Sequence, residues 1–499
     1  MAPRRRLLES HATESQEPNL ETIAKTDFVA DLTKKSVDLS RWYTEVILKS
    51  QLADYWQIHG FQVLRPYGYA LWENMQARLD ARFKATGHRN VQFPLLMPES
   101  LLNQEAKHVE GFAPEVAWVT HAGKEELSER LAIRPTSEAI IMTMYSKWIE
   151  SWRDLPMLLN QWCSVLRWEK STRFFLRTSE FLWQEGHTAH RSAEEAQAET
   201  MRMLEIYRDF VENDLAIPVI VGQKSEAEKF AGAASTYTIE SLMPDGQALQ
   251  SATSHYFGDN FARAFNITFQ DMDGERKFVH TTSWGLSWRA VGALIMVHGD
   301  DAGLIMPPKV APTQVVIVPI RGDDATVVEA VARAEESLRG AFRIEVDRSD
   351  RTPGWKFNEH EMRGVPLRIE IGPRDAKNTQ AVIVRRDTRE KAIVAESALA
   401  TEVGRLLDAI HQNLFERART FRDAHVTEAD SLVALTTGLK ANPGFVIGHW
   451  CGKAECERAV KEQTGATIRC IPFDFQNGPG RCVIDGAASE KRAIFARAY

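Results

Sequence analysis

The segment SVLRWEKSTRFFLRTSEFLWQEGH, residues 164–187, mixes charged and aromatic side chains more densely than the rest of the chain. Its arginines are Arg167, Arg173 and Arg177, its glutamates Glu169, Glu180 and Glu185, and its aromatic residues Trp168, Phe174, Phe175, Phe181 and Trp183. A solvated surface does not need so many aromatic side chains, and a buried strand tolerates charges only when each is paired. The mixture therefore indicates a pocket for a ligand that is both aromatic and polyanionic.

The segment is expected to form a β-hairpin, with SVLRWE as one strand, KSTR as the turn and FFLRTSEFLW as the return strand. Side chains alternate between faces, so Arg167 and Glu169 share one face, as do Arg177 and Phe181. A nucleotide needs guanidinium forks for its phosphates and a stacking partner for its base. These four residues can supply both, although a salt-bridged surface hairpin explains the local pattern equally well.

A second segment, TTSWGLSWRAVGALIMVHGDD at residues 281–301, places Arg289 at the start of an otherwise apolar helix. An arginine in such surroundings requires an anionic partner, because burying an unpaired charge costs several kcal/mol. The partner is either a ligand anion or a structural carboxylate.

The composition is that of an ordinary globular protein, with 499 residues, 44% hydrophobic and 26% charged. The net charge of −7 argues against a generally basic nucleic-acid coat, but not against a localised positive patch. Five cysteines are too few for a secreted disulfide framework. No apolar run approaches the ~20 residues of a membrane span, and the N-terminus has no apolar signal region. We expect a cytoplasmic protein with no membrane contact.

The pattern of the chain predicts four regions. Residues 1–37 are expected to be a flexible arm, and residues 38–310 a catalytic domain with an antiparallel or mixed sheet and helices. Residues 311–418 show the order βαβαββα, which predicts a compact α/β domain with a mostly parallel sheet. Residues 419–499 form a small α+β unit that contains four of the five cysteines.

Three motifs in order resemble those of class II aminoacyl-tRNA synthetases. Arg167-x-Glu169, a loop and Arg177-x-x-x-Phe181 resemble motif 2, Gly285-Leu-x-x-Arg289 resembles motif 3, and NVQFPLLMPES at 90–100 resembles motif 1. The resemblance implies an antiparallel catalytic sheet with helices, an α/β anticodon-binding domain and a small α+β C-terminal domain. Motif 1 builds the dimer interface in that class, so a homodimer is expected.

Five further stretches narrow the resemblance to the prolyl-tRNA synthetase family, in its form without an inserted editing domain. They are RPTSEAI (134–140), FLRTSEFLWQEGHTAH (175–190), EKFAGAASTYTIE (228–240), LQSATSHYFG (249–258) and VHGDDAGLIMPPKVAP (297–312). The resemblance implies an ATP-dependent ligase that activates L-proline to prolyl-adenylate. The prolyl group is then transferred to the 3′ end of proline tRNA, and AMP and pyrophosphate are released.

The resemblance also implies roles for individual residues. Arg167 and Arg289 are the expected catalytic residues: Arg167 bridges the proline carboxylate and the α-phosphate, and Arg289 clamps the other side of the nucleotide. The residues expected to touch ATP are Arg167, Glu169, Arg177, Thr178, Phe181, Gln250, Thr253, Ser287 and Arg289. Magnesium is expected to neutralise the phosphates.

The expected proline pocket comprises Thr136, Glu138, Arg167, Trp183, Phe230 and His255. Proline needs acceptors for the two N–H bonds of its secondary ammonium and apolar walls for its methylenes. Ser137 and Glu138 could instead be the N-cap and first-turn acid of a helix, and His255 a structural histidine. An apolar pocket rejects alanine only weakly, and the interval from Arg177 to Arg289 is too short for a hydrolytic domain, so no editing site is expected.

The later regions suggest two further sites. In KFNEHEMRGVPLRIEIGPRD, Glu361, Arg368 and Arg374, with Arg363 and Glu370, suit hydrogen bonding to the base edges of an anticodon, although surface charge pairs are the alternative. Relatives hold zinc with four cysteines, whereas this chain has Cys451, Cys456, Cys482 and then Asp485. Asp485 or Cys470 could complete the site, but the broken pattern favours loss of zinc. In the family, a terminal aromatic residue such as Tyr499 turns back towards the active site.

Two other interpretations compete with this one. A synthetase for threonine, serine or glycine would share the scaffold, but a threonine enzyme would want zinc ligands in the catalytic region, where Cys163 stands alone and is expected to be core. A non-catalytic paralogue that only binds tRNA could lose Arg167, Arg177 and Arg289, and all three are present.

Overall fold

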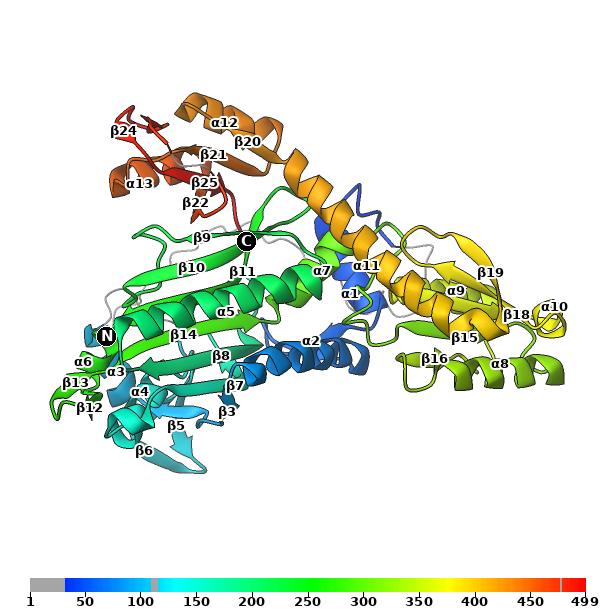
Figure 1. Cartoon of the computed structure of the whole chain (residues 1–499), viewed down its shortest axis with the longest axis horizontal. Helices are drawn as coiled ribbons and strands as arrows, with labels where there is room; N and C mark the ends of the chain where they lie inside the picture. The colour runs from blue at the N-terminus through cyan, green and yellow to red at the C-terminus, as the bar shows by residue number, and fades with distance from the viewer. Residues whose placement is uncertain (1–31, 109–114, 476–477) are drawn as a thin grey trace, which may run out of the picture.

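The computed structural model describes residues 32–108, 115–475 and 478–499. Figure 1 shows three parts: a broad sheet with helices at the centre, an α/β unit at one end and a small unit above the sheet. Most of the predicted N-terminal arm, residues 1–31, lies outside the described residues.

Six antiparallel strands form the centre of the catalytic domain, in the order β9-β10-β11-β14-β8-β7, with the short strand β3 added in parallel at the edge. Their bounds are β3 Arg89–Asn90, β7 Met157–Leu166, β8 Glu180–His190, β9 Val219–Gln223, β10 Ser235–Leu242, β11 Ala248–Gly258 and β14 His280–Ser287. The expected antiparallel catalytic sheet is confirmed.

Helix α5 (Ala193–Asn213) covers one face of this sheet (Figure 1). Ser192 caps its N-terminus by accepting a hydrogen bond from Glu195 N at 3.2 Å. Its apolar side packs on the strands, where Tyr207 donates to Gln184 Oε1 of β8. Because strand side chains alternate between faces, residues one position away from Gln184 point to the opposite face, which α5 leaves uncovered.

Other elements surround the central sheet. The helices are α1 Leu39–Lys49, α2 Pro66–Ala85, α3 Glu99–His108, α4 Glu138–Trp148, α6 Asn260–Ala264 and α7 Arg289–His298. The short strands are β1 Ala53–Tyr55, β2 Gln62–Leu64, β4 Leu96–Pro98, β5 Trp118–Ala122, β6 Glu125–Ile133, β12 Thr268–Gln270 and β13 Arg276–Phe278.

The second domain has a five-stranded sheet in the order β16-β15-β17-β18-β19. Its elements are β15 Val315–Pro319, α8 Ala325–Leu338, β16 Ile344–Val346, α9 Pro353–Met362, β17 Leu367–Ile371, α10 Pro373–Lys377, β18 Gln380–Arg385, β19 Lys391–Ala395 and α11 Leu399–Ala424. The βαβαββα order is present, but the sheet is mixed rather than mostly parallel, because β17–β18 and β18–β19 are antiparallel. Helix α11 runs six residues past the predicted boundary at 418.

The C-terminal unit contains β20 Val426–Glu428, α12 Leu432–Ala441, β21 Phe445–His449, α13 Ala454–Thr464, β22 Thr467–Pro472, β23 Gly480–Arg481, β24 Ala488–Ser489 and β25 Arg492–Ala496. Its sheet is continuous with the catalytic sheet, because Ile471 and Pro472 of β22 pair with Gln223 and Gly222 of β9. Glu240 of β10 lies in this junction with its side chain fully buried, paired with Lys224 at 2.8 Å and Arg469 at 3.0 Å. No helix in the described ranges is both long and apolar enough to cross a bilayer.

Candidate active site

Strand register places the predicted residues on the face of the sheet that α5 leaves open. On β8, Phe181 and Trp183 alternate with Gln184, which contacts α5, and they therefore point away from that helix. Ser287 of β14 lies opposite Trp183. On the next strand, Thr253 lies opposite Gly285, which is two residues from Ser287 and on the same face.

A β-bulge brings Gln250 to the same face as Thr253. The pairing of β10 with β11 runs from Thr238 opposite Thr253 to Glu240 opposite Gln250, and Ser251 is the extra residue. Without the bulge, positions 250 and 253 would point to opposite faces, since they differ by an odd number. Sequence alternation alone could not have placed both side chains in one site.

Arg167 lies over the aromatic residues of this face. It follows the last residue of β7, and its guanidinium lies 5.4 Å from the Phe181 ring and 5.3 Å from the Trp183 ring. Its Nε donates to Pro135 O at 3.0 Å, which fixes the fork. Burial is the main influence that lowers the pKa of Arg167, and the nearby positive charge of Arg289 lowers it further. Because Trp183, next to Arg167, lies opposite Ser287, two residues before Arg289, the two predicted catalytic arginines face one space.

Arg289 enters the same space from the first residue of α7. Its Nε donates to Leu176 O at 3.1 Å, and its backbone N–H donates to the Ser287 hydroxyl at 3.3 Å. Burial lowers the pKa of Arg289, and the charges of Glu240 and Glu169 act in the opposite direction. Both carboxylates already form ion pairs with other residues, since Glu169 pairs with Arg177 and Glu240 pairs with Lys224 and Arg469.

Glu169 and Arg177 pair with each other, with Arg177 Nε 2.7 Å from Glu169 Oε2. The Arg177 side chain is 59% exposed, so this is a weak surface pair that a triphosphate can replace. The neighbouring Thr178 hydroxyl is buried and has no hydrogen-bond partner. An unsatisfied buried hydroxyl is costly and fits a position that a ligand completes.

The predicted return strand begins later than expected. Strand β8 starts at Glu180, and residues 167–179 form a loop closed by a bridge between Arg173 and Arg177. The loop is held from outside, because Ser179 N donates to Gly60 O at 2.8 Å. Phe175 has a positive φ of 57°, a conformation that a regular strand does not allow. Arg177 therefore sits on a loop and not on a strand face.

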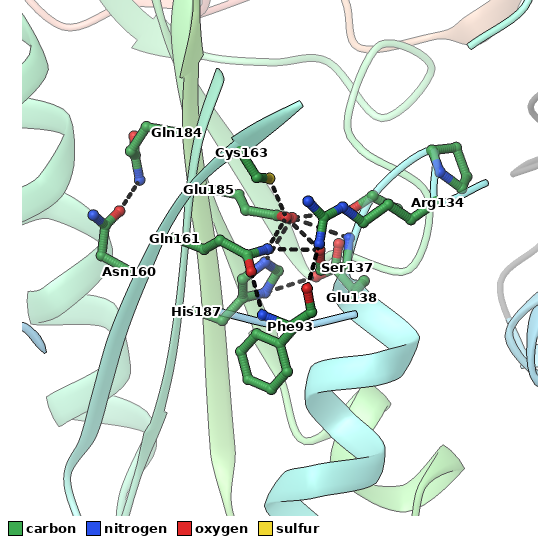
Figure 2. A network of polar contacts seen from close by, with 12 residues as sticks. Phe93, Arg134, Ser137, Glu138, Asn160, Gln161, Cys163, Gln184, Glu185 and His187 are labelled. Carbon is green, nitrogen blue, oxygen red and sulfur yellow. Dashed lines mark hydrogen bonds and ion pairs between the residues drawn. The ribbon is translucent and has the colours of Figure 1, made fainter. Parts of the chain in front are cut away.

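The pocket beside Arg167 is a closed hydrogen-bond network centred on Glu185 (Figure 2). The Glu185 carboxylate accepts from Ser137 N at 3.1 Å, Gln161 Nε2 at 2.9 Å, His187 Nε2 at 3.2 Å, Thr136 Oγ1 at 3.4 Å and the Ser137 hydroxyl. Burial alone would raise the pKa of Glu185, but the bond from His187 and those from Ser137 lower it to about 2. Glu185 is a permanent buried anion.

Ser137 does not cap its helix. It occupies the N-cap position of α4, yet its side chain makes no capping bond and donates to Glu185 instead. Glu138, the first residue of α4, has its side chain fully buried, and its Oε1 has no hydrogen-bond partner. The helix-capping alternative therefore fails for Ser137, while Oε1 of Glu138 is free to accept a hydrogen bond from a ligand.

The Glu138 carboxyl group changes between its neutral and charged forms near neutral pH. Burial raises the pKa of Glu138 to about 7, against the charge of His187, whose Nδ1 lies 3.7 Å from Glu138 Oε1. That distance is too long for a hydrogen bond, and His187 Nδ1 is also unpartnered. His187 has its own pKa raised, because the bond to Glu185 and the two carboxylate charges outweigh burial. A cationic ammonium placed here would favour the Glu138 carboxylate.

The walls of the pocket are aromatic and neutral. Burial lowers the pKa of His255 to about 3, so its imidazole is uncharged, and its Nδ1 lies 2.9 Å from the Thr236 hydroxyl. The Phe230 ring packs against it at 4.8 Å. His255 is thus both a hydrogen-bonded structural histidine and a wall residue, and Trp183 closes the side next to Arg167.

Four residues of this network were not predicted as site residues: Ser137, Gln161, Glu185 and His187. Glu185 and His187 follow Trp183 at a spacing of two on β8, and this alternation is the signal that could have identified them. The prediction that Cys163 is core was wrong. Cys163 lies opposite Trp183, is half-buried, and its thiol is 3.5 Å from Glu185, because position 163 shares the open face with Gln161.

Comparison with known proteins identifies the family. The description "tRNA synthetase class II core domain (G, H, P, S and T)" matches residues 118–298, and "Anticodon binding domain" matches residues 314–406. "Prolyl-tRNA synthetase, C-terminal" matches residues 435–499. The proline--tRNA ligase of Lachnoclostridium phytofermentans is 56% identical over 94% of this chain and 98% of its own length. The chain belongs to the prolyl-tRNA synthetase family.

Other members of the family agree with this assignment. The proline--tRNA ligase of Alkaliphilus oremlandii is 56% identical over 95% of this chain and 98% of its own length. A crystal structure of prolyl-tRNA synthetase from Cryptosporidium parvum, complexed with halofuginone and AMPPNP, superposes with a TM-score of 0.90. It shares 40% identity and covers 95% of this chain and 100% of its own. The expected class II architecture is confirmed.

The residues predicted to contact the anticodon do not form one cluster in the anticodon-binding domain of this prolyl-tRNA synthetase family member. Arg368 Nη1 lies 3.2 Å from Glu361, and its Nε donates to Glu370 at 3.0 Å. Arg374 is exposed on α10, beyond the other end of β17 from Arg368. Arg363 is an interdomain residue, since its guanidinium donates to Gln51 of the catalytic domain.

The C-terminal cysteines converge. Ligand atoms of Cys451, Cys456, Cys482 and Asp485 all lie within 4.8 Å of one another. The Cys451 and Cys456 sulfurs are 3.6 Å apart, and Cys451 Sγ is 3.8 Å from Asp485 Oδ2. A tetrahedral zinc with Zn–S bonds of about 2.3 Å separates its sulfurs by about 3.8 Å, so this set fits zinc. Cys470 is buried in a separate cluster with Ile220 and is not part of the set.

Tyr499 folds back onto the catalytic domain. Its N–H donates to Ala248 O at 3.1 Å at the start of β11, and its hydroxyl donates to Asp245. Arg173 of the 167–179 loop stacks 5.5 Å from the Tyr499 ring and 4.8 Å from the Tyr43 ring. The C-terminus therefore supports the loop that carries Arg177.

Proposed function

We propose that this chain is an ATP-dependent proline--tRNA ligase whose chemistry takes place on the open face of the catalytic sheet. One observation carries the assignment of the site. Arg167 and Arg289 face one space, and that space adjoins a buried polar network in which the Oε1 atom of Glu138 has no hydrogen-bond partner.

The activation step needs two anions held in contact. The proline carboxylate attacks the α-phosphorus, and a bond forms between a carboxylate oxygen and phosphorus while pyrophosphate leaves. Arg167 lies between the aromatic wall and the space in front of Arg289, where its fixed fork can hold both anions in attack geometry. Arg289 stabilises the developing charge from the other side.

ATP is proposed to bind in the partly exposed half of the site, around Arg177 and Glu169. Arg177 leaves Glu169 for the outer phosphates, which frees the Glu169 carboxylate to accept from the adenine amine. Thr178, Gln250, Thr253 and Ser287 supply polar contacts around the nucleotide, and Phe181 faces its base. Magnesium enters with the triphosphate, and since it prefers oxygen ligands, phosphate and water oxygens are its main partners.

The proline half of the site selects the amino acid. The secondary ammonium donates to Glu138 and to the Thr136 region, and the ring packs between Trp183, Phe230 and His255. The permanent charge of Glu185 holds Ser137, Gln161 and His187 in place around the pocket. Alanine fits the same walls, so the purified enzyme should form alanyl-tRNA and should not hydrolyse it. Hydrolysis by this chain alone would contradict the absence of an editing site.

The remaining parts serve the tRNA and the assembly. Glu361 and Arg368 are proposed to contact anticodon bases, with Arg374 as a peripheral contact. We also propose a cytoplasmic homodimer that uses the motif 1 segment at residues 90–100. All five cysteines are free thiols, as suits a reducing compartment.

Zinc is proposed to bind the Cys451, Cys456, Cys482 and Asp485 set as a structural ion. Its role is to tie the segment around α13 to the turn after β23, and Lys453, 2.8 Å from Asp485, orients the carboxylate. Elemental analysis of purified protein should find about one zinc per chain. The Asp485→Ala variant should lose most of it, and Asp485→Cys should retain it. If the purified wild-type protein contains no zinc, the proposed zinc site is wrong and the expectation that this chain has lost zinc is correct.

Amino-acid-dependent ATP–pyrophosphate exchange tests the proposed function directly. Exchange should require proline and should be absent with threonine, serine or glycine. Exchange with one of those amino acids instead would favour the alternative synthetases. No exchange with any amino acid, from a protein that still binds tRNA, would favour the non-catalytic paralogue.

A further inference from the structure

The C-terminal end of α7, the helix that begins at Arg289, is held by residues from outside the catalytic core. Lys35 Nζ, from the segment before α1, donates to Met296 O at 2.6 Å and Gly299 O at 2.7 Å. Arg417 of α11 donates to His298 O at 3.0 Å. The last carbonyls of a helix lack intrahelical donors and carry partial negative charge, so these two cations fix the helix end.

Asp300, just beyond the helix, forms an ion pair with the anticodon-binding domain. Arg386, in the turn between β18 and β19, donates to it through both terminal nitrogens, at 2.8 and 2.6 Å. The Arg386 side chain is only 2% exposed and the Asp300 side chain is 34% exposed, so this two-pronged contact is partly buried and has a defined orientation. Trp42 of α1 holds the other side of the residue by donating to Asp300 O at 2.9 Å.

The same guanidinium also contacts the proposed anticodon site. Arg386 Nε donates to the backbone carbonyl of Glu361 at 3.0 Å. The Glu361 side chain, in turn, lies 3.2 Å from Arg368 Nη1. One arginine therefore connects a residue proposed to contact the tRNA with the end of the helix that carries Arg289.

Helix α7 is built to transmit a displacement. It is ten residues long, or about 15 Å, and residues 290–296 are all buried against neighbouring elements. A Cβ added at Gly292 would lie 2.6 Å from Leu176 Cδ2, so the helix touches the loop whose Leu176 carbonyl accepts from Arg289. A closely packed helix moves as a unit, and a shift at Asp300 changes the position of Arg289.

We propose that the Asp300–Arg386 pair couples anticodon binding to the position of Arg289, so that both act as positioning residues for the reaction. This inference goes beyond the proposed function and rests on its anticodon contacts. Coupling of this kind is reciprocal in free energy, and in proteins it typically changes affinity or rate 5–150-fold.

The Asp300→Asn variant, which keeps the shape and removes the charge, tests the coupling. Two quantities are measured: proline-dependent ATP–pyrophosphate exchange without tRNA, and kcat/KM for charging proline tRNA and the same tRNA with exchanged anticodon bases. Exchange without tRNA should stay within about twofold of wild type, because it involves no anticodon and because Lys35 and Arg417 still hold the end of α7. The ratio of the two kcat/KM values should fall about fivefold or more, because the correct anticodon no longer accelerates charging. Arg386→Lys, which retains charge but not the planar fork, should lower the ratio less.

Asp387→Asn is the matched control. Asp387 lies in the same turn, its side chain is fully buried, and it pairs with Arg385 at 2.7 Å within the domain. This variant should leave the ratio unchanged. An unaltered ratio in Asp300→Asn and Arg386→Lys, or an equal fall in Asp387→Asn, would overturn the proposal. If Asp300→Asn does not fold, Arg386→Lys decides. A wild type that charges both tRNAs equally would refute the anticodon contacts themselves, and the coupling with them.

Discussion

Glu185 and Glu169 are carboxylates on the two sides of Arg167, and their surroundings are opposite. Glu185 is buried and accepts hydrogen bonds from four residues that the fold supplies. Glu169 is partly exposed and pairs with the exposed side chain of Arg177 on a loop. The proposed proline half of the site is therefore largely formed before the substrate arrives, whereas the proposed nucleotide half is expected to exchange its internal pair for ligand contacts. Pre-organisation lowers the cost of binding a small amino acid that offers few contacts of its own.

The largest effect should follow from replacing Arg167, which is proposed to contact both substrates. Arg167→Lys keeps the charge and loses the planar fork, so proline-dependent pyrophosphate exchange should fall about 10²–10³-fold. Arg343→Lys is the control, because Arg343 uses its fork only to bind backbone carbonyls such as Ala311 O, at 2.8 Å. It should lower the melting temperature and leave exchange intact. Equal losses of exchange in both variants would point to unfolding.

Glu138→Gln tests the pre-organised half. Loss of a charged acceptor for the proline ammonium should raise the KM for proline about 10–100-fold, with the KM for ATP nearly unchanged. Glu199→Gln, a buried glutamate on α5 on the other side of the sheet, is the control and should change neither constant. A rise in both KM values for Glu138→Gln would mean that the two halves are not separable.

Arg177→Gln tests the exchangeable half. Since Arg177 is exposed and its pair with Glu169 is weak, the KM for ATP should rise only about tenfold, and the KM for proline should stay constant. Steady-state kinetics with each substrate varied in turn measures both values. An unchanged KM for ATP would remove Arg177 from the nucleotide site and assign it to the surface pair alone.

The smallest expected effect is a pH dependence confined to the proline half. The pKa of Glu138 is about 7 in the free pocket, where it faces His187, Glu185, Ser283 and Arg167. A bound ammonium stabilises the carboxylate, so proline binds the deprotonated form and affinity falls as pH drops through 7. Between pH 7.5 and 6.5 the KM for proline should rise about threefold. In the Glu138→Gln variant the KM for proline should not change over this pH range. If it still rises as the pH falls, the titrating group is His187.

Several features of the fold and the site could be predicted because they are local. The aromatic and charged residues around Arg167 and Arg177 and the apolar helix behind Arg289 indicate the ligand class, and the resemblance of these motifs to class II synthetases indicates the family. The βαβαββα order follows from hydrophobic periodicity within each element. Each of these depends on residues close together in sequence, or on a motif that the family shares.

Other features were decided only by the tertiary structure. The bulge at Ser251 aligns Gln250 with Thr253, and β22 joins the catalytic sheet although it lies far from β9 in sequence. The pKa values of Glu185 and Glu138 differ although both residues are buried, because hydrogen bonds lower one pKa and burial raises the other. Pairing partners and desolvation are set by distant segments packed together, and no local pattern of residues contains that information.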